Sequence, residues 1–169
     1  MSLELEYIKT RNIYEYGDIL KPLHRDFGYA FYESCLFWCE VIKSEMPDYY
    51  WEFRLIKLYG NTIGCCGLYS MNEKTDELWL SWFGLVPELR NLGIGKQVLE
   101  YLENEARKIN CKTILSYVDK EGKPLPFYKR NGFDVIGTVA DYIQNNNVDR
   151  EEFEDNDDYV IRKNLTYSK

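Results

Sequence analysis

Residues 85–102, LVPELRNLGIGKQVLEYL, pass from the apolar end of a strand through a proline and two glycines into a segment with helical periodicity. From Val98 to Ile109, apolar residues recur at the spacing of one helix face, which predicts an amphipathic helix of about four turns. A helix that starts at a glycine offers unpaired backbone N–H groups and the positive end of its dipole. The junction therefore predicts a phosphate-binding site.

Two common phosphate-binding loops do not fit these residues. A Walker loop would place glycine at position 90 and serine or threonine at position 97, where this chain has Arg90 and Gln97. A dinucleotide-binding loop would place a further glycine at position 98, where this chain has Val98, and would not accommodate the intervening PELRN segment. The remaining pattern is Arg-x-x-Gly-x-Gly, RNLGIG at residues 90–95.

Length and charge limit the functions open to this chain. Its 169 residues, 45% of them hydrophobic, fit one globular domain spanning residues 1–169. The 28 acidic residues outnumber the 21 basic ones and give a net charge of -7, which argues against a nucleic-acid partner. Solubility explains such an acidic surplus, although it would also suit a cationic partner.

The cysteines and the N-terminal residues indicate a cytoplasmic protein with reduced thiols. The five cysteines show neither a disulfide-framework nor a zinc-ribbon spacing. Cys35 and Cys39 could join His24 as metal ligands, but small core residues are the better interpretation, so no metal site is predicted. The N-terminus lacks a signal-peptide pattern and no apolar run is long enough to span a membrane, so no membrane partner is expected.

The N-terminal half is predicted to contain a strand, two helices and a β-hairpin. Residues 3–9 alternate apolar and charged residues, which predicts the first strand. Residues 50–70 contain two β-rich runs separated by Gly60 and Asn61, the composition of a tight turn, and residues 77–86 continue the antiparallel meander. Between them, the second helix carries a core-facing stripe of Phe27, Phe31, Cys35, Trp38 and Ile42.

The C-terminal half is predicted to add three strands and a short helix. A crossover helix would place the next strand, residues 112–118, parallel to residues 77–86. Residues 124–133 predict a short helix with prolines in its first turn and Gly132 at its C-terminal cap. Two final strands are expected at residues 133–142 and 157–165, with an exposed loop at residues 145–157 between them.

A second sequence element lies downstream of the glycine junction. Residues 127–133, FYKRNGF, follow a Phe-Tyr-x-x-x-Gly-Phe pattern. Together with RNLGIG, this run resembles the signature of the GNAT N-acetyltransferase superfamily, and the resemblance covers residues 77–137 well. It implies an α/β (α+β) fold with a mixed, mostly antiparallel central sheet of about seven strands flanked by helices. It also implies acetyl-CoA as a cosubstrate, without a metal.

The resemblance places the diphosphate of acetyl-CoA at the glycine junction. Gly93 and Gly95 would let the backbone approach the phosphates, and Arg90 would add a charge-assisted contact. Pantetheine would lie between the strand that ends at Leu85 and its parallel neighbour near Ser116. The implied cofactor-binding residues are Leu85, Val86, Arg90, Asn91, Leu92, Gly93, Ile94, Gly95 and Lys96.

Two side chains are predicted to carry the chemistry. By the resemblance, Tyr128 is the general acid that protonates the departing CoA thiolate, and a backbone N–H near Leu85 stabilises the oxyanion. Glu77 is the candidate base, acting directly or through water, because strand alternation relates it to Ser81 and Leu85. Asp76 or a carboxylate of the N-terminal helical region is the alternative base.

Three functions share the predicted diphosphate site. The first is direct transfer of acetyl from acetyl-CoA to a primary amine of a small molecule or peptide. The second is transfer of a different acyl group from its CoA thioester, and the third is a CoA-binding sensor without turnover. Tyr128 favours catalysis over sensing. The expected partners are therefore the amine acceptor and, left open, a second copy of the chain in a homodimer.

The sequence does not identify the acceptor. Residues 149–158, DREEFEDNDD, hold seven carboxylates against one arginine and could attract a cationic amine. Glu121 stands seven residues before Tyr128, where many family members carry an asparagine that helps to hold the cofactor, so this contact is left out of the predicted site. An aromatic acceptor pocket is an alternative to core packing for Trp79, Trp82, Tyr29, Tyr32, Tyr49 and Tyr50.

Overall fold

The computed structural model describes the central sheet, the helices that follow it in the sequence and short parts of the N-terminal region. In the part of the chain that the structure describes, no helix is both long enough and apolar enough to cross a membrane. The described residues are 3–10, 12–17, 21–23, 28, 31–32, 35–36, 50–71, 73, 75–146 and 157–167.

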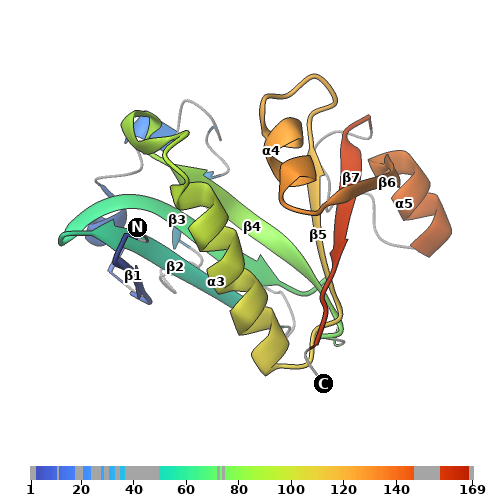
Figure 1. Ribbon diagram of the computed structural model, residues 1–169, viewed down its shortest axis with the longest axis horizontal. Helices are drawn as coiled ribbons and strands as arrows, with labels where there is room; N and C mark the ends of the chain where they lie inside the picture. Colours follow the sequence, from blue (N-terminus) through green and yellow to red (C-terminus); the bar gives the residue numbers. More distant parts are fainter. Residues whose placement is uncertain are drawn as a thin grey trace.

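Seven strands form one sheet in the order β1-β2-β3-β4-β5-β7-β6 (Figure 1). Every neighbouring pair is antiparallel except β4 and β5, which run parallel. The predicted fold class, a mixed and mostly antiparallel sheet flanked by helices, is confirmed. The strands are β1 (Leu5–Ile8), β2 (Trp51–Leu58), β3 (Asn61–Tyr69), β4 (Glu77–Leu85), β5 (Thr113–Val118), β6 (Asp134–Thr138) and β7 (Tyr159–Asn164).

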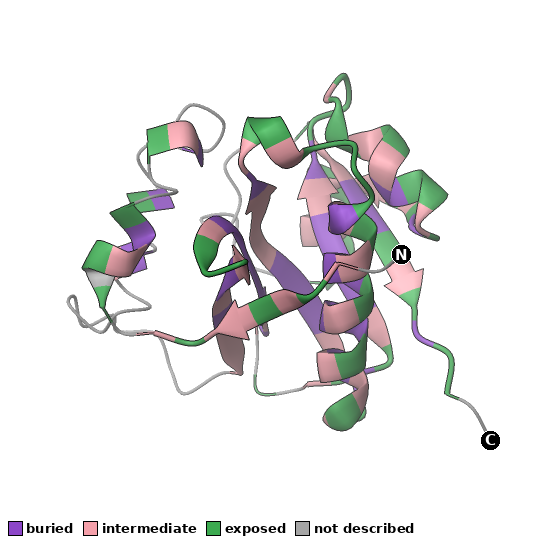
Figure 2. Ribbon diagram, turned by 60° about the vertical axis from the view of Figure 1, so that its left-hand side comes forward, coloured by how far each residue is buried: buried purple, intermediate pink, exposed green. Residues whose placement is uncertain are grey.

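Helices cover both faces of this sheet. The helix α3 (Ile94–Lys108) joins β4 to β5 and shares a core with α4 (Pro124–Arg130) and Leu78 on one face. The helix α5 (Val139–Asn146) packs on the opposite face, against Trp79. Figure 2 shows the buried residues concentrated in the central strands and the exposed residues along the outer sides of the helices. Two short 3-10 helices are η1 (Ile13–Tyr16) and η2 (Pro87–Leu89).

The predicted β2–β3 hairpin is confirmed, with its turn shifted by one residue. The turn residues are Tyr59 and Gly60, at φ 50° and 75°, whereas Asn61 is the first residue of β3 and pairs with Leu58. Positive φ at both turn positions matches the twist of the flanking strands. The predicted Gly60–Asn61 turn is therefore one residue too late.

The strand predicted at residues 133–142 is wrong in its second half. β6 ends at Thr138 and α5 begins at Val139. Oδ2 of Asp141 accepts a hydrogen bond from the Thr138 N–H at 2.8 Å, and Oγ1 of Thr138 accepts one from the Asp141 N–H at 3.1 Å. This reciprocal cap satisfies backbone donors at the start of a helix, so the chain turns from strand to helix here.

Two predicted segments lie largely outside the described residues. Of the loop predicted at residues 145–157, the first two residues belong to α5, and residues 147–156 are not described. Of the predicted N-terminal helical stripe, Phe31 and Cys35 are helical and fully buried. Phe27, Trp38 and Ile42 lie outside the described ranges.

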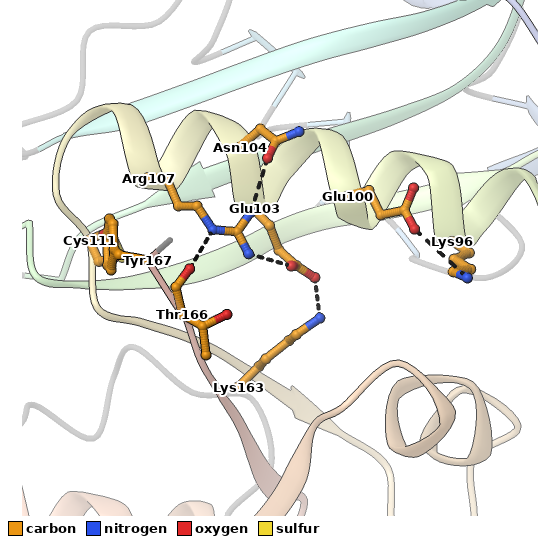
Figure 3. A network of polar contacts seen from close by, with 9 residues as sticks. All are labelled: Lys96, Glu100, Glu103, Asn104, Arg107, Cys111, Lys163, Thr166 and Tyr167. Atoms are coloured by element: carbon orange, nitrogen blue, oxygen red, sulfur yellow. Dashed lines mark hydrogen bonds and ion pairs between the residues drawn. The ribbon is translucent and has the colours of Figure 1, made fainter. Parts of the chain in front are cut away.

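A partly buried ion-pair network ties the C-terminal half of α3 to β7 (Figure 3). One carboxylate oxygen of Glu103, a residue only 6% exposed, binds Nζ of Lys163, and the other lies 3.1 Å from a guanidinium nitrogen of Arg107. Arg107 also donates from Nε to the carbonyl of Thr166 at 3.2 Å. The network holds α3 against the strand that flanks β5.

Candidate functional site

The parallel strands β4 and β5 diverge like the arms of a fork. They are paired at three positions only, ending at Trp79 and Leu115, whereas β5 stays paired with β7 up to Val118. Figure 1 shows the two strands separating toward the top of the view. We call the paired residues the paired end and the stretch from Leu80 to Leu85 the open end. At the open end, β4 has a partner on one side only among the described strands.

The backbone at the last residue of β4 points into this fork. The Val86 N–H donates to the carbonyl of Ile63 in β3 at 2.8 Å, so the N–H and C=O of the preceding residue, Leu85, point to the opposite side. Nε of Arg90 donates to that Leu85 carbonyl at 2.8 Å. The Leu85 N–H therefore faces the gap in which the thioester was predicted to lie.

A β-bulge lies within the open end of β4. Trp82 and Phe83 together stand opposite one residue of β3, Cys66. Trp82 adopts a φ of 36°, and its carbonyl accepts a hydrogen bond from the thiol of Cys65 at 2.9 Å. The bulge inserts one extra residue into the side-chain alternation of β4.

Glu77 lies at the paired end, not at the open end. Its carboxylate accepts a hydrogen bond from the Tyr142 hydroxyl of α5 at 2.6 Å, whereas Leu85 packs in the core under α3. The prediction that Glu77 and Leu85 share a face is wrong, because the bulge shifts the alternation by one residue. The two residues are roughly 25 Å apart along the strand. Asp76, the alternative base, lies beside Glu77 and pairs with Lys112 at 3.9 Å.

The N-terminus of α3 follows the open end of β4 through η2. Its N-cap residue Gly93 has a φ of 82°, and within the described chain no side chain caps the first turn, which also lacks acidic residues. A Cβ atom on Gly93 would meet no described atom within 4 Å. The free N–H groups of this turn therefore border open space, as a bound anion would require.

Gly95 has a different role from Gly93. A Cβ atom on Gly95 would lie 3.1 Å from the ring of Phe127 in α4 and 3.7 Å from the ring of Phe83 in β4. These two rings pack on each other with centroids 6.0 Å apart. The absence of a side chain at Gly95 lets α3 approach α4 closely, so the two sequence elements RNLGIG and FYKRNGF meet in the structure.

The other residues predicted to hold the cofactor are spread between the core and the surface. Ile94 is buried in the core, so only its backbone is available to a ligand. Leu92 is 61% exposed, and Asn91 is exposed with a φ of 64°. Lys96 is exposed and pairs with Glu100 at 3.8 Å.

Tyr128 of α4 lies in the core that this helix shares with Ile114 and Val118 of β5. Its side chain is 7% exposed and packs edge-on against the rings of Phe127 and Phe133, with centroids 5.2 and 5.3 Å away. Burial raises the pKa of Tyr128 well above its ordinary value, so the phenol stays protonated at neutral pH.

Two of the aromatic residues considered for an acceptor pocket pack against other parts of the molecule. Trp79 is 1% exposed and belongs to the core under α5. The ring of Trp82 packs against Phe31, with centroids 5.6 Å apart. Tyr29 and Tyr49 lie outside the described ranges.

No metal site is found in the described part of the chain, where no group of three or more His, Cys, Asp or Glu side chains could hold an ion. Among the described residues, four cysteines are buried and form no disulfide: Cys35, Cys65, Cys66 and Cys111. Burial raises the pKa of the Cys65 and Cys66 thiols, so both remain protonated at neutral pH.

The sequence matches the profile of the Acetyltransferase (GNAT) family over residues 13–133. This match confirms the resemblance drawn from the two motifs and the prediction of an acyltransferase. No curated protein matches the sequence.

Several solved structures share the fold at low sequence identity. A GNAT-family acetyltransferase of Staphylococcus aureus is 21% identical, with a TM-score of 0.66, 96% of this chain covered and 100% of that one. The PaiA N-acetyltransferase of Thermoplasma acidophilum, in complex with coenzyme A, is 18% identical, with a TM-score of 0.63 and coverages of 97% and 99%. N-acetylglutamate synthase of Neisseria gonorrhoeae, complexed with coenzyme A and N-acetyl-glutamate, is 13% identical, with a TM-score of 0.65. That match covers 99% of this chain but only 36% of the synthase.

Proposed function

The chain belongs to the acetyltransferase (GNAT) family, and we propose that it transfers the acetyl group of acetyl-CoA directly to a primary amine of a small molecule or peptide. The observation that carries this proposal is the open end of the fork. Among the described residues, β4 has no second partner strand there, no side chain caps the N-terminus of α3, and the buried Tyr128 lies nearby. The coenzyme A bound in the PaiA and synthase structures supports the choice of cosubstrate.

The residues at the open end fit the parts of acetyl-CoA. The first-turn N–H groups of α3 suit a diphosphate, and Gly93 leaves the space beside them open. The edge of β4 suits the amide groups of pantetheine, since these can pair with a strand edge as a peptide does. Arg90, held by the Leu85 carbonyl, joins these two parts of the site.

The chain's own groups then supply the electrostatics and the proton. Acetyl-CoA brings an acetyl group activated as a thioester. The Leu85 N–H is assigned to the carbonyl oxygen that becomes negative during attack. Tyr128 gives its phenolic proton to the CoA sulfur as the carbon–sulfur bond breaks. A protonated amine gives up two protons as it becomes an amide; one is returned to Tyr128 and the other is released to water, so the protons balance.

The base that deprotonates the amine is a separate assignment. Glu77 is the predicted base, but it lies at the paired end and accepts a hydrogen bond from Tyr142. From that position it would have to act through ordered water. Glu77 therefore stays a prediction to be tested, and we assign no base at the open end.

A thiol-release assay tests the proposed function. Acetyl-CoA is offered with polyamines, aminoglycosides, amino acids and N-terminal peptides, and mass spectrometry identifies the acetylated product. We expect turnover of at least one amine, with cationic amines preferred because of the acidic residues 149–158. Faster turnover with a longer acyl-CoA would instead identify the second function. Tight calorimetric binding of CoA without turnover of any amine would identify a sensor.

A further inference from the structure

We propose that Gly64 and Cys65 of β3 are positioning residues for the oxyanion donor: they hold the bulged backbone of β4 so that the Leu85 N–H faces the gap of the fork. This inference rests on the proposed function, because it concerns the group that stabilises the oxyanion of that reaction. It assigns a role to two residues that lie outside both sequence motifs.

The peptide group between Gly84 and Leu85 has its two polar ends on opposite sides of β4. The Leu85 N–H faces the fork, because the N–H of the next residue, Val86, donates to Ile63 of β3 at 2.8 Å. In a trans peptide the carbonyl points away from the N–H, so the Gly84 carbonyl points toward β3. A contact that fixes this carbonyl therefore also fixes the direction of the Leu85 N–H.

Gly64 is the residue of β3 against which this peptide group packs. It stands opposite Leu85 in the strand register. A Cβ atom on Gly64 would lie 2.3 Å from the Gly84 carbonyl oxygen and 2.9 Å from Cδ2 of Leu85. Both distances are too short for non-bonded atoms, so a larger residue would force the peptide group to move. The absence of a side chain at Gly64 thus permits the observed orientation of the Leu85 N–H.

Cys65 holds β4 at the bulge. Its thiol donates to the Trp82 carbonyl at 2.9 Å, and Trp82 has a φ of 36°. A residue other than glycine keeps such a backbone conformation only where its surroundings hold it. The Cys65 side chain is fully buried beside Leu55 and Phe53, so the thiol is itself fixed in place. Burial also raises the pKa of this thiol, which keeps the proton that it donates.

Three successive residues of β3 therefore hold the end of β4. Cys65 binds the Trp82 carbonyl, Gly64 accommodates the peptide group that ends at Leu85, and Ile63 binds the N–H of the following residue. A bulge locally interrupts the regular ladder of hydrogen bonds, so these contacts compensate for the interruption. The proposed oxyanion donor lies between the first and the last of them.

The reaction requires this donor to be in place before charge develops. As the amine nitrogen bonds to the thioester carbon, the electron pair of the carbon–oxygen double bond moves onto oxygen. It returns when the carbon–sulfur bond breaks and the thiolate leaves. A donor already aimed at that oxygen stabilises the charge without reorganisation, whereas a rotated peptide group would not. The contacts from β3 should therefore affect kcat more than cofactor binding.

Two glycine variants of β3 provide a matched test, with the amine found by the thiol-release assay. Gly64→Ala should lower kcat by about 10² and leave the KM for acetyl-CoA within about threefold. Gly67→Ala is the control, because its Cβ atom would lie 2.5 Å from the Glu52 carbonyl oxygen, a similar clash with β2 on the other side of β3. Its kcat, measured well below the unfolding transition, should stay within about twofold. Equal losses of kcat in the two variants would overturn the proposal.

The cysteine variants decide the matter where Gly64→Ala does not fold. Cys65→Ala should lower kcat about tenfold, and Cys65→Ser, which keeps a donor, should recover to within about threefold of the wild-type value. Cys66→Ala is the control, since it removes an equally buried thiol from the opposite face of β3 and should leave kcat within about twofold. No recovery in Cys65→Ser, or an equal loss in Cys66→Ala, would overturn the role of Cys65.

Infrared spectra of bound acetyl-CoA, isotope-labelled at the acetyl carbonyl carbon, test the position of the donor without an acceptor. A hydrogen bond from the Leu85 N–H lowers the carbonyl stretching frequency below that of acetyl-CoA in buffer. This shift should be lost in Gly64→Ala and Cys65→Ala and kept in Gly67→Ala and Cys66→Ala. The same frequency in all four variants would overturn the positioning roles.

The two proposals fail in different ways in these experiments. Absence of amine turnover by the wild-type protein would contradict the proposed function. Wild-type turnover together with unchanged kcat in Gly64→Ala and Cys65→Ala would overturn the positioning roles alone.

Discussion

The two ends of β4 differ in what surrounds them. At the paired end, β4 lies between β3 and β5, and Glu77 is bonded to Tyr142 on the face covered by α5. The C-terminal half of α3 is held to β7 by the ion pair between Glu103 and Lys163. At the open end, β4 has β3 alone as its neighbour among the described strands, and the chain leads directly into the uncapped N-terminus of α3. One strand thus serves packing at one end and faces a ligand site at the other.

The difference shows how a sheet can open without losing its other hydrogen bonds. Each diverging strand keeps a partner on its far side, β3 for β4 and β7 for β5. The bulge at Trp82 bends β4 away, and the Cys65 thiol donates to the Trp82 carbonyl at this irregular position. Among the described residues this edge has no partner strand, so its backbone groups are available to water or a ligand.

The largest expected effect is the loss of acetyl-CoA binding in Gly95→Trp. The indole cannot fit where a Cβ atom alone would lie 3.1 Å from Phe127, so α3 must move away from α4 and the glycine junction must change. We expect acetyl-CoA affinity to fall below detection by calorimetry while circular dichroism shows a folded protein. Unchanged affinity for acetyl-CoA would mean that the diphosphate binds elsewhere. The open end would then not differ from the paired end as a ligand site.

Tyr128→Phe should lower kcat by about 10² or more, because it removes the proton donor and keeps the ring. The KM for acetyl-CoA should stay nearly constant. Tyr142→Phe is the matched control, since it removes a tyrosine hydroxyl at the paired end and should change kcat by less than about twofold. Equal losses in the two variants would mean that the ends do not differ in function.

Glu103→Gln should affect stability and not turnover. It removes the charge that pairs with Lys163 and Arg107, which are both mostly buried, and should lower the free energy of unfolding by roughly 2–3 kcal/mol. Denaturant unfolding measures this loss, and kcat measured well below the unfolding transition should not change. A fall in kcat without a fall in stability would mean that Glu103 takes a direct part in catalysis.

The smallest effect is expected for Glu77→Gln. The amide keeps the size of the side chain and an acceptor for Tyr142, and the position at the paired end predicts a change in kcat below about twofold. Steady-state rates across a pH series are the measurement. A fall of about 10², with loss of the acidic limb of the pH profile, would identify Glu77 as the base and show that the paired end reaches the reaction through water.

The sequence predicts the open end better than it predicts the bulge within that end. The helix at residues 94–108 follows from apolar periodicity, and the parallel strand at residues 113–118 follows from the crossover that this helix makes. Trp82 is neither glycine nor proline, so its residue type gives no sign of a bulge. Its φ of 36° occurs where its carbonyl accepts a hydrogen bond from Cys65 of β3. Side-chain alternation counted along β4 therefore fails beyond Trp82.

Two further features show what local patterns miss. The start of α5 is marked in the sequence by Thr138 and Asp141, spaced as a helix cap, but the preceding β-rich residues favoured a longer strand. Packing of Val139 and Tyr142 around Trp79 favours the helix. The close approach of α3 to α4 at Gly95 and Phe127 joins two segments far apart in the sequence, so no spacing within either segment indicates it.

The central claim is that the sulfur of CoA lies at the open end of the fork, beside Tyr128. A crystal structure of the protein with CoA measures this directly. The account predicts the sulfur within about 3.5 Å of the Tyr128 hydroxyl oxygen, and the diphosphate oxygens on the first-turn N–H groups of α3. A sulfur outside the gap between β4 and β5, or a diphosphate bound to another segment, would contradict it.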